Sequence, residues 1–305
     1  MDIKSNSLRE VLSRAFGLNL APDNLIEAKS GTDESAETGN LKIVDDELKQ
    51  RAGRRLLAEE ISKQKNIEGV VQRTDKLLES EPEISKSTEE TDQGWVDECL
   101  DGAGKAYNDD LKDYWAKLLA GEIKHPGFYS LRAIDFMKKL SKKDAERIRE
   151  MCKYVMYNVD KSDAIILRYK ESPFLYSDLS FLMELRLIDS SNFIVKQYRF
   201  KNEDGGIDLF VHGDVGLVLN VKSKEYDLPI YSFTQLGKEM LTIIDDQEAD
   251  IDYLREFARI TTGKRNKLEI SGGHMEVIDD TLNIKKDEYG FTYPEEIREK
   301  SNDAK

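Results

Sequence analysis

The chain has 305 residues, 39% of them hydrophobic and 35% charged, so there is room for two domains with a core in each. Its formal net charge of −14 at pH 7 argues against broad electrostatic capture of nucleic acid, because phosphate contacts need clustered Lys and Arg. Two cysteines without metal-ligand spacing indicate neither a disulfide framework nor a zinc site, and no apolar run approaches the ~20 residues that span a bilayer.

The first 44 residues predict a short helix followed by a flexible linker. Between residues 7 and 16 the apolar side chains fall on one helical face, and two arginines make a weak basic face for a membrane surface. We therefore expect this amphipathic helix to dock on its own protein or on a sister subunit. The acidic tract at 21–47 has few apolar side chains, which is typical of a flexible linker.

A long helix is predicted at 45–78, where apolar residues recur roughly in helical register and no proline occurs before Pro82. An interruption at 66–69 is an alternative. The apolar stripe is thin for so long a helix, which favours packing against a partner helix in the same chain or in another. Because a sister chain is a natural cover, we expect an oligomer.

An acidic linker near 79–94 precedes a compact group of helices. Pro126 and Gly127 predict a turn between two of them. The side chains and positions of three residues are typical of N-caps: Asn108, Ser130 and Ser141. We expect buried helical positions to continue through Val155 and Met156, so that the helical module covers 45–160.

After residue 160 the pattern changes to short β-rich runs with helices between them. Strands are expected at 164–169, 193–200, 207–211, 216–221 and 268–270. Helices are expected at 177–187, from an N-cap-like Thr234, and at 250–260. The predicted fold class is therefore α+β, with the helical module at 45–160, a smaller α+β module at 161–285 and a flexible tail at 286–305.

A resemblance to a bacterial family, domain of unknown function 2806, is carried by the runs RLLAEEISKQKNIEGVV at 55–71 and YWAKLLAGEIKHPGFYSLRAIDFMKKLSKKDA at 114–145. It covers most of 50–188 and continues weakly to 244. Its signature residues, which we expect to be structural, are Trp115, Gly121, Glu122, Pro126, Gly127, Ser130 and Arg132. The first half also resembles, more loosely, the abortive-infection alpha proteins that bacteria use against phage, which implies a defence context by association.

Glu122 and His125 have the E-x-x-H spacing that places two metal ligands on one helical face. A di-metal bundle needs a second such pair, and the other histidines, His212 and His274, supply none. We therefore expect no metal and no cofactor, with this pair serving a helix end. Trp115 lies in an apolar stripe and is expected in the core rather than in a ligand platform.

Four lysines straddle a helix junction in a locally basic stretch: Lys138, Lys139, Lys142 and Lys143. They predict either a solvated face or a phosphate-contacting patch. In the second half, the helix at 177–188, the strands after it and the helix from Thr234 resemble the helix, wing and helix of winged-helix regulators. The connection is far longer than a simple wing, so the pattern favours a scaffold for protein contacts and a DNA-binding domain equally.

The segment from Asp208 through Asp214 to Asn220 and Lys222 is faintly similar to the pattern of metal-dependent nucleases. Asn220 stands where that chemistry needs a carboxylate to hold the cation. The sequence contains no P-loop, no G-x-S-x-G, no G-x-G-x-x-G and no C-x-x-C motif, so nucleotide hydrolysis, acyl transfer and dinucleotide binding have no motif support.

These patterns favour a non-enzymatic cytoplasmic interaction or regulatory protein of a phage-defence or mobile-element locus. It would work through self-association of the long helix and the helical module, or through a protein partner. One alternative is a nucleic-acid-binding regulator that uses the winged-helix-like half. The remote alternative is a metal-dependent nuclease.

Overall fold

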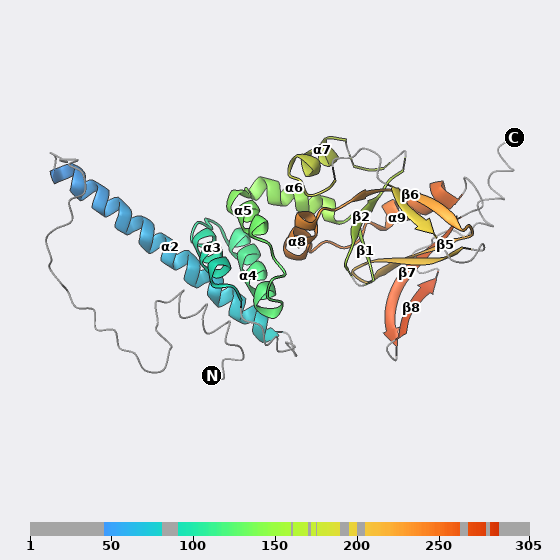
Figure 1. Ribbon diagram of the computed structural model, residues 1–305, viewed down its shortest axis with the longest axis horizontal. Coiled ribbons are helices and arrows are strands. Elements are labelled where there is room, and N and C mark those ends of the chain that lie inside the picture. Colours follow the sequence, from blue (N-terminus) through green and yellow to red (C-terminus); the bar gives the residue numbers. More distant parts are fainter. Residues whose placement is uncertain are drawn as a thin grey trace. The chain divides into compact units, whose positions relative to one another are not determined.

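The computed structural model in Figure 1 describes residues 46–80, 91–159, 161–169, 172–174, 176–189, 195–199, 205–262, 268–278 and 281–286. The chain divides into two compact units, with the boundary between Leu140 and Ser141. The first unit is helical and the second combines an antiparallel sheet with helices, so the predicted α+β class is confirmed. The helix and linker predicted before residue 45, most of the linker at 79–94, and the tail beyond 286 lie outside the described residues.

In the first unit the long helix α2 (Asp46–Ser80) packs along α4 (Asp109–Lys124) and also contacts α3 (Gln93–Ala103). The helix is continuous, so the alternative of an interruption at 66–69 is wrong. Arg73 on α2 binds the carboxylates of Asp109 and Asp113 on α4 at 2.8 and 2.7 Å. These pairs join the C-terminal half of α2 to the first turns of α4.

The core of the first unit forms where α4 meets its neighbours. Trp115, Leu118 and Leu119 are buried on α4, as the apolar stripe predicts, and Ile134 and Met137 are buried on α5 (Leu131–Lys139). The predicted caps are confirmed, because the side chains of Asn108 and Ser130 accept the backbone N–H groups of the third residue on. Each helix therefore begins where the sequence places a side-chain acceptor.

The second unit begins with α6 (Lys142–Cys152), which Ser141 caps as predicted. The expectation that Val155 and Met156 are helical is wrong, because Val155–Asn158 forms strand β1. Val155 is β-branched, and this stretch pairs with β2 (Ala164–Leu167) across a tight connection at Asn158 to Asp163. Helix α6 and strand β1 therefore belong to the second unit, whereas the helices that precede them belong to the first.

Antiparallel pairing orders the sheet β3-β6-β2-β1-β4-β5-β7-β8. The remaining strands are β3 (Val195–Arg199), β4 (Gly206–His212), β5 (Val215–Val221), β6 (Glu225–Ser232), β7 (Leu268–Ile278) and β8 (Thr281–Lys286). Strands β1, β6 and β8 were not predicted from the sequence. The strands β4 and β5 join through a turn at Gly213, where φ is +58°. A left-handed conformation of this kind favours glycine.

Three more helices belong to the second unit: α7 (Tyr176–Glu184), α8 (Gln235–Ile244) and α9 (Ile251–Thr262). Thr234 caps α8, as predicted. Buried side chains from α8, α9 and the strands fill the core, among them Phe210, Leu217, Ile243, Leu254 and Phe257. Within the ranges given above, no helix combines the length and apolar character needed to cross a membrane.

Candidate functional site

The turn between α4 and α5 carries most of the signature residues. His125 ends α4, Pro126 and Gly127 turn the chain with Gly127 at φ +82°, and Ser130 caps α5. Because glycine adopts positive φ without steric cost, Gly127 suits this position. The backbone N–H of Phe128 donates to the backbone oxygen of His125 within the turn, whereas the N–H groups of Gly127 and Tyr129 need acceptors from elsewhere.

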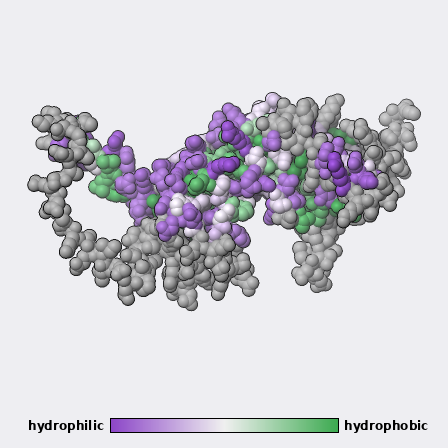
Figure 2. Space-filling view, in the orientation of Figure 1, coloured by the Kyte–Doolittle hydropathy of each residue, from purple (hydrophilic) through white to green (hydrophobic). Residues whose placement is uncertain are grey.

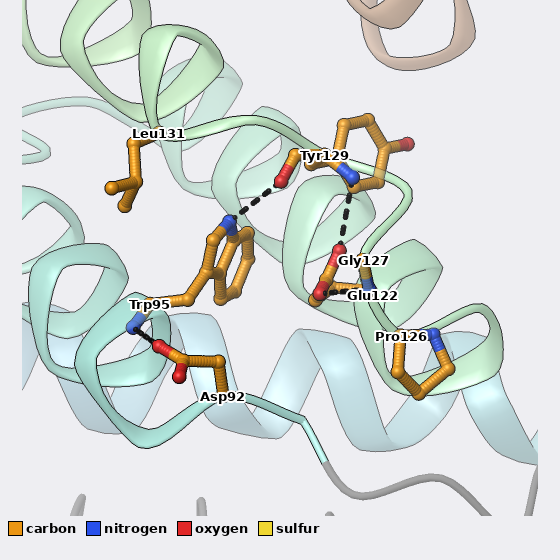
Figure 3. A pocket seen from close by; sticks show the side chains of 7 residues that line it. All are labelled: Asp92, Trp95, Glu122, Pro126, Gly127, Tyr129 and Leu131. Atoms are coloured by element: carbon orange, nitrogen blue, oxygen red, sulfur yellow. Dashed lines mark hydrogen bonds between the residues drawn. The ribbon is translucent and has the colours of Figure 1, made fainter.

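Glu122 supplies those acceptors. Its carboxylate is buried, and it accepts the backbone N–H of Gly127 at 2.6 Å and that of Tyr129 at 3.0 Å (Figure 3). The indole Nε1–H of Trp95, on α3, donates to the backbone oxygen of Tyr129 at 2.9 Å. A buried carboxylate is stable when donors surround it, and here the donors belong to the turn. Glu122 therefore holds the α4–α5 turn against the end of α4, and Trp95 joins the same turn to α3.

A shallow pocket of about 410 Å³ opens beside this turn (Figure 3). Its lining residues are Asp92, Trp95, Glu122, Pro126, Gly127, Tyr129 and Leu131. Its polar groups already have partners within the protein: Asp92 caps α3 through the N–H of Trp95, and Glu122 binds the turn. The pocket therefore presents no unpaired acid, base or nucleophile for a reaction.

Two glycines set the spacing between these elements. A Cβ on Gly121 would lie 2.7 Å from the ring of Tyr129, and one on Gly102 would lie 2.3 Å from the ring of Trp115. Both distances are shorter than real side-chain contacts, so the absence of a side chain lets the rings approach the helix backbones. Of the signature residues, only Arg132 is exposed without a role in this packing.

The E-x-x-H pair does not form a metal site with other residues. The Glu122 carboxylate binds the turn that follows it in the chain, while His125 is exposed at the end of α4. No group of three or more His, Cys, Asp or Glu side chains in the described part of the chain is arranged to hold a metal ion. His212 and His274 belong to the second unit, on β4 and β7.

Replacing Glu122 with Gln is expected to lower the free energy of unfolding by about 1.5–3 kcal/mol, because hydrogen bonds to a charged acceptor are worth roughly that much. The amide would also direct N–H groups toward N–H groups of the turn. His125→Ala, three residues on and exposed, is the matched control and should change stability by less than about 0.5 kcal/mol. Equal melting curves for Glu122→Gln and the native protein would contradict the structural role of Glu122.

The four lysines of the helix junction fall in both units. Lys138 binds Glu98 on α3 at 2.5 Å and also lies 3.7 Å from Asp101, so acidic neighbours compensate its charge. Lys139 is exposed on α5, and Lys142 and Lys143 are exposed on α6, where Lys142 lies 3.9 Å from Glu146. A phosphate-contacting patch stays a prediction, with the Lys138 ammonium already engaged within the protein.

The nuclease-like residues are not brought together. Asp208 on β4 stands opposite Leu219 on β5, and directly opposed residues share one face of a sheet. Asn220 follows Leu219 and therefore faces the other side. There Glu269 on β7 contacts both Asn220 and Lys222. Asp214 lies in the β4–β5 turn, so no cation-binding set forms from these residues.

The strands of the winged-helix-like segment do not form a separate wing. The strands between α7 and α8 belong to the large sheet, and Ile188 forms an isolated bridge with Phe233. Thr234 bonds through its hydroxyl to the backbone oxygen of Arg186, which places the start of α8 beside the end of α7. The two helices are thus neighbours although far apart in sequence.

The second unit contains a buried polar cluster that was not predicted from the sequence. The ring nitrogens of His212 lie 2.6 Å from the backbone oxygen of Val155 and 2.8 Å from that of Gln247. The hydroxyl of Tyr157 donates to Asp245, and burial together with this carboxylate raises the pKa of Tyr157. These bonds tie the loop after α8 to β1 and β4, and no spacing in the sequence indicates them.

The outer half of α2, defined as Asp46 to Ser62, is the most distinctive surface of the first unit. Its apolar side chains are uncovered: Leu56 is 54% exposed, Leu57 63% and Ile61 48%. Figure 1 shows this half extending past α3 and α4, and Figure 2 shows hydrophobic residues gathered on it. In the other half of the same helix, Val70, Val71 and Leu78 are buried.

Comparison with known proteins identifies a family. The model of a family described as "Protein of unknown function (DUF2806)" matches residues 50–258, more than half of the chain, which confirms the resemblance drawn from the signature. No curated protein matches the chain, and no solved structure does.

Proposed function

We propose that this chain, which belongs to the DUF2806 family of proteins of unknown function, is a non-enzymatic interaction protein that self-associates through the outer half of α2. The exposed apolar face of that half is the observation that carries the proposal. Scattered exposed leucines are ordinary on protein surfaces, whereas a run of them on one projecting helix favours a partner.

The residues with the strongest chemical signatures support a role other than catalysis. The Glu122 carboxylate is occupied by two backbone donors of the α4–α5 turn. The nuclease-like Asp208 and Asn220 are directed to opposite faces of the sheet by their register. The thiols of Cys99 and Cys152 are buried, and burial raises the pKa of each, which is the opposite of what a nucleophilic cysteine needs.

Energetics favour a covered state for the outer half of α2. Full burial of a Leu or Ile side chain is worth about 1.5–3 kcal/mol. Leu48, Leu56, Leu57 and Ile61 are each about half exposed or more, so covering them in two copies at once offsets much of the cost of association. A second copy brings the same face and therefore the same uncovered side chains.

Light scattering on the full chain tests the proposal. The native protein is expected to show at least twice the mass of one chain at micromolar concentration, and a Leu56→Glu, Leu57→Glu double variant is expected to be monomeric. The matched control is Ala58→Glu with Ser62→Glu, which adds equal charge at exposed positions elsewhere on the same helix and should keep the native mass. A native protein that is monomeric throughout the micromolar range would overturn the proposal.

The looser resemblance to abortive-infection alpha proteins supports placing this interaction role in a phage-defence or mobile-element setting. Plaque counts on cells with and without the gene would test that setting, and equal counts across a broad phage panel would remove it. The nucleic-acid alternative stays a prediction as well. Salt-sensitive duplex binding that charge reversal at Lys139 and Lys143 abolishes would favour it over self-association as the main role.

A further inference from the structure

The outer half of α2 lacks the seam of a coiled coil. In no heptad frame do apolar residues occupy both the a and the d positions through Asp46 to Ser62. Its small and apolar residues instead follow two adjacent rows at i, i+4 spacing. One row is Leu48, Ala52 and Leu56, and the other is Gly53, Leu57 and Ile61. Rows of this spacing form ridges that pack into the grooves of a similar helix.

Resting on the self-association proposed above, we infer that two copies pair antiparallel through these rows, about a twofold axis between Arg54 and Arg55. This axis sets Ala52 of one copy against Leu57 of the second copy and Gly53 against Leu56 of the second copy. Leu48 lies level with Ile61 of the second copy, on the flanks of the contact. Each close pair at the centre then joins a small residue to a large one.

Space and helix geometry agree with this arrangement. A Cβ on Gly53 would meet nothing within 4 Å, so the helix surface there is open to an incoming leucine. At 3.6 residues per turn, the two rows lie on either side of one line along the helix, and Arg54 and Arg55 point away from that line. The twofold axis therefore brings no arginine of one copy onto an arginine of the other.

Charge favours the antiparallel direction over a parallel one. The same axis sets Lys49 against Glu60 of the second copy, so each end of the contact gains a pair of opposite sign. In a parallel pair in register, Lys49 would face Lys49 of the second copy and Glu60 would face Glu60. Glu60 binds Lys63 of its own chain at 3.1 Å and stays largely exposed, so its carboxylate is accessible to a second partner.

Charge exchange in the full chain tests the direction. Lys49→Glu alone and Glu60→Lys alone should each weaken self-association about tenfold, because each creates two repulsive pairs across the axis. The double variant Lys49→Glu, Glu60→Lys restores both pairs and should return to within about twofold of the native dissociation constant. In a parallel pair, the single variants only exchange one like-charge pair for another, so unchanged affinities would overturn the antiparallel inference.

Cross-linking gives an independent readout. Cys99 and Cys152 are buried, so a thiol introduced at an exposed position is the one that reacts. A mixture of Lys49→Cys chains and Glu60→Cys chains should give mixed dimers with a short bismaleimide. Lys49→Cys chains alone should give none, because their thiols would be roughly 16 Å apart along the axis at 1.5 Å per residue.

The two proposals fail differently. Cross-linking of Lys49→Cys chains to one another, without mixed dimers, would mean a parallel pair and would leave self-association standing. A monomeric native protein would overturn both proposals. If a thiol introduced at Leu57 also resists labelling in that monomer, another segment of the same chain covers the apolar face.

Discussion

Replacing Trp115 with Ala is expected to lower the free energy of unfolding of the first unit by about 3–5 kcal/mol. The indole is 2% exposed and lies on α4, against the side of α3 where Gly102 offers no side chain. Removing the ring leaves a cavity beside a glycine, and a rigid helix backbone closes such a cavity only in part. Denaturant unfolding followed by far-UV circular dichroism measures the loss.

Leu131→Ala is the control for Trp115→Ala. Leu131 lies in the same unit and is 56% exposed, so its truncation should cost less than about 1 kcal/mol. A Trp115→Ala protein with the native melting temperature but without self-association would contradict a core role. Trp115 would then belong to a binding surface.

Gly237→Ala is expected to destabilise the second unit by about 3 kcal/mol. In most helix interiors the same substitution stabilises by about 1 kcal/mol, because helices prefer Ala over Gly. Gly237 lies in the first turn of α8, and a Cβ there would be 2.0 Å from the backbone oxygen of Leu187. That oxygen also accepts the N–H of Thr234, the cap of α8. The clash therefore pushes α8 away from the segment that follows α7.

The same substitution at Gly69 is the control for Gly237→Ala. Gly69 lies inside α2, and a Cβ there would make only ordinary contacts, the nearest at 3.4 Å with the flexible end of Arg73. Gly69→Ala should therefore leave stability unchanged or raise it by up to about 1 kcal/mol. If thermal melts show Gly237→Ala to be as stable as the native chain, the close approach of α8 to Leu187 is wrong.

The family signature takes on a physical meaning in this structure. Gly121, Glu122, Gly127 and Ser130 together build one turn between α4 and α5, with Trp115 in the core beneath it. A run of this kind is recognisable because each position has a steric or hydrogen-bonding requirement. It marks the way this unit is held together, and the surface proposed to bind lies elsewhere, on the outer half of α2.

The features that the sequence determined by itself are those set by local chemistry. Asn108, Ser130, Ser141 and Thr234 were identifiable as caps because a side-chain oxygen at a helix start bonds a backbone N–H only three residues away. The Pro126-Gly127 turn was identifiable for a similar reason, since the two residues restrict or free the backbone at their own positions.

Only the tertiary structure decided the rest, because it depends on partners distant in the chain. Val155 and Met156 continue a helical apolar pattern, yet pairing with β2 makes them a strand. The register of β4 with β5 separates Asp208 from Asn220, and a shift of one residue would have reversed that result. The sequence pattern of the apolar stripe is the same in both halves of α2. Helix α4 covers one half and leaves the other exposed, because a helix is buried only where another element packs against it.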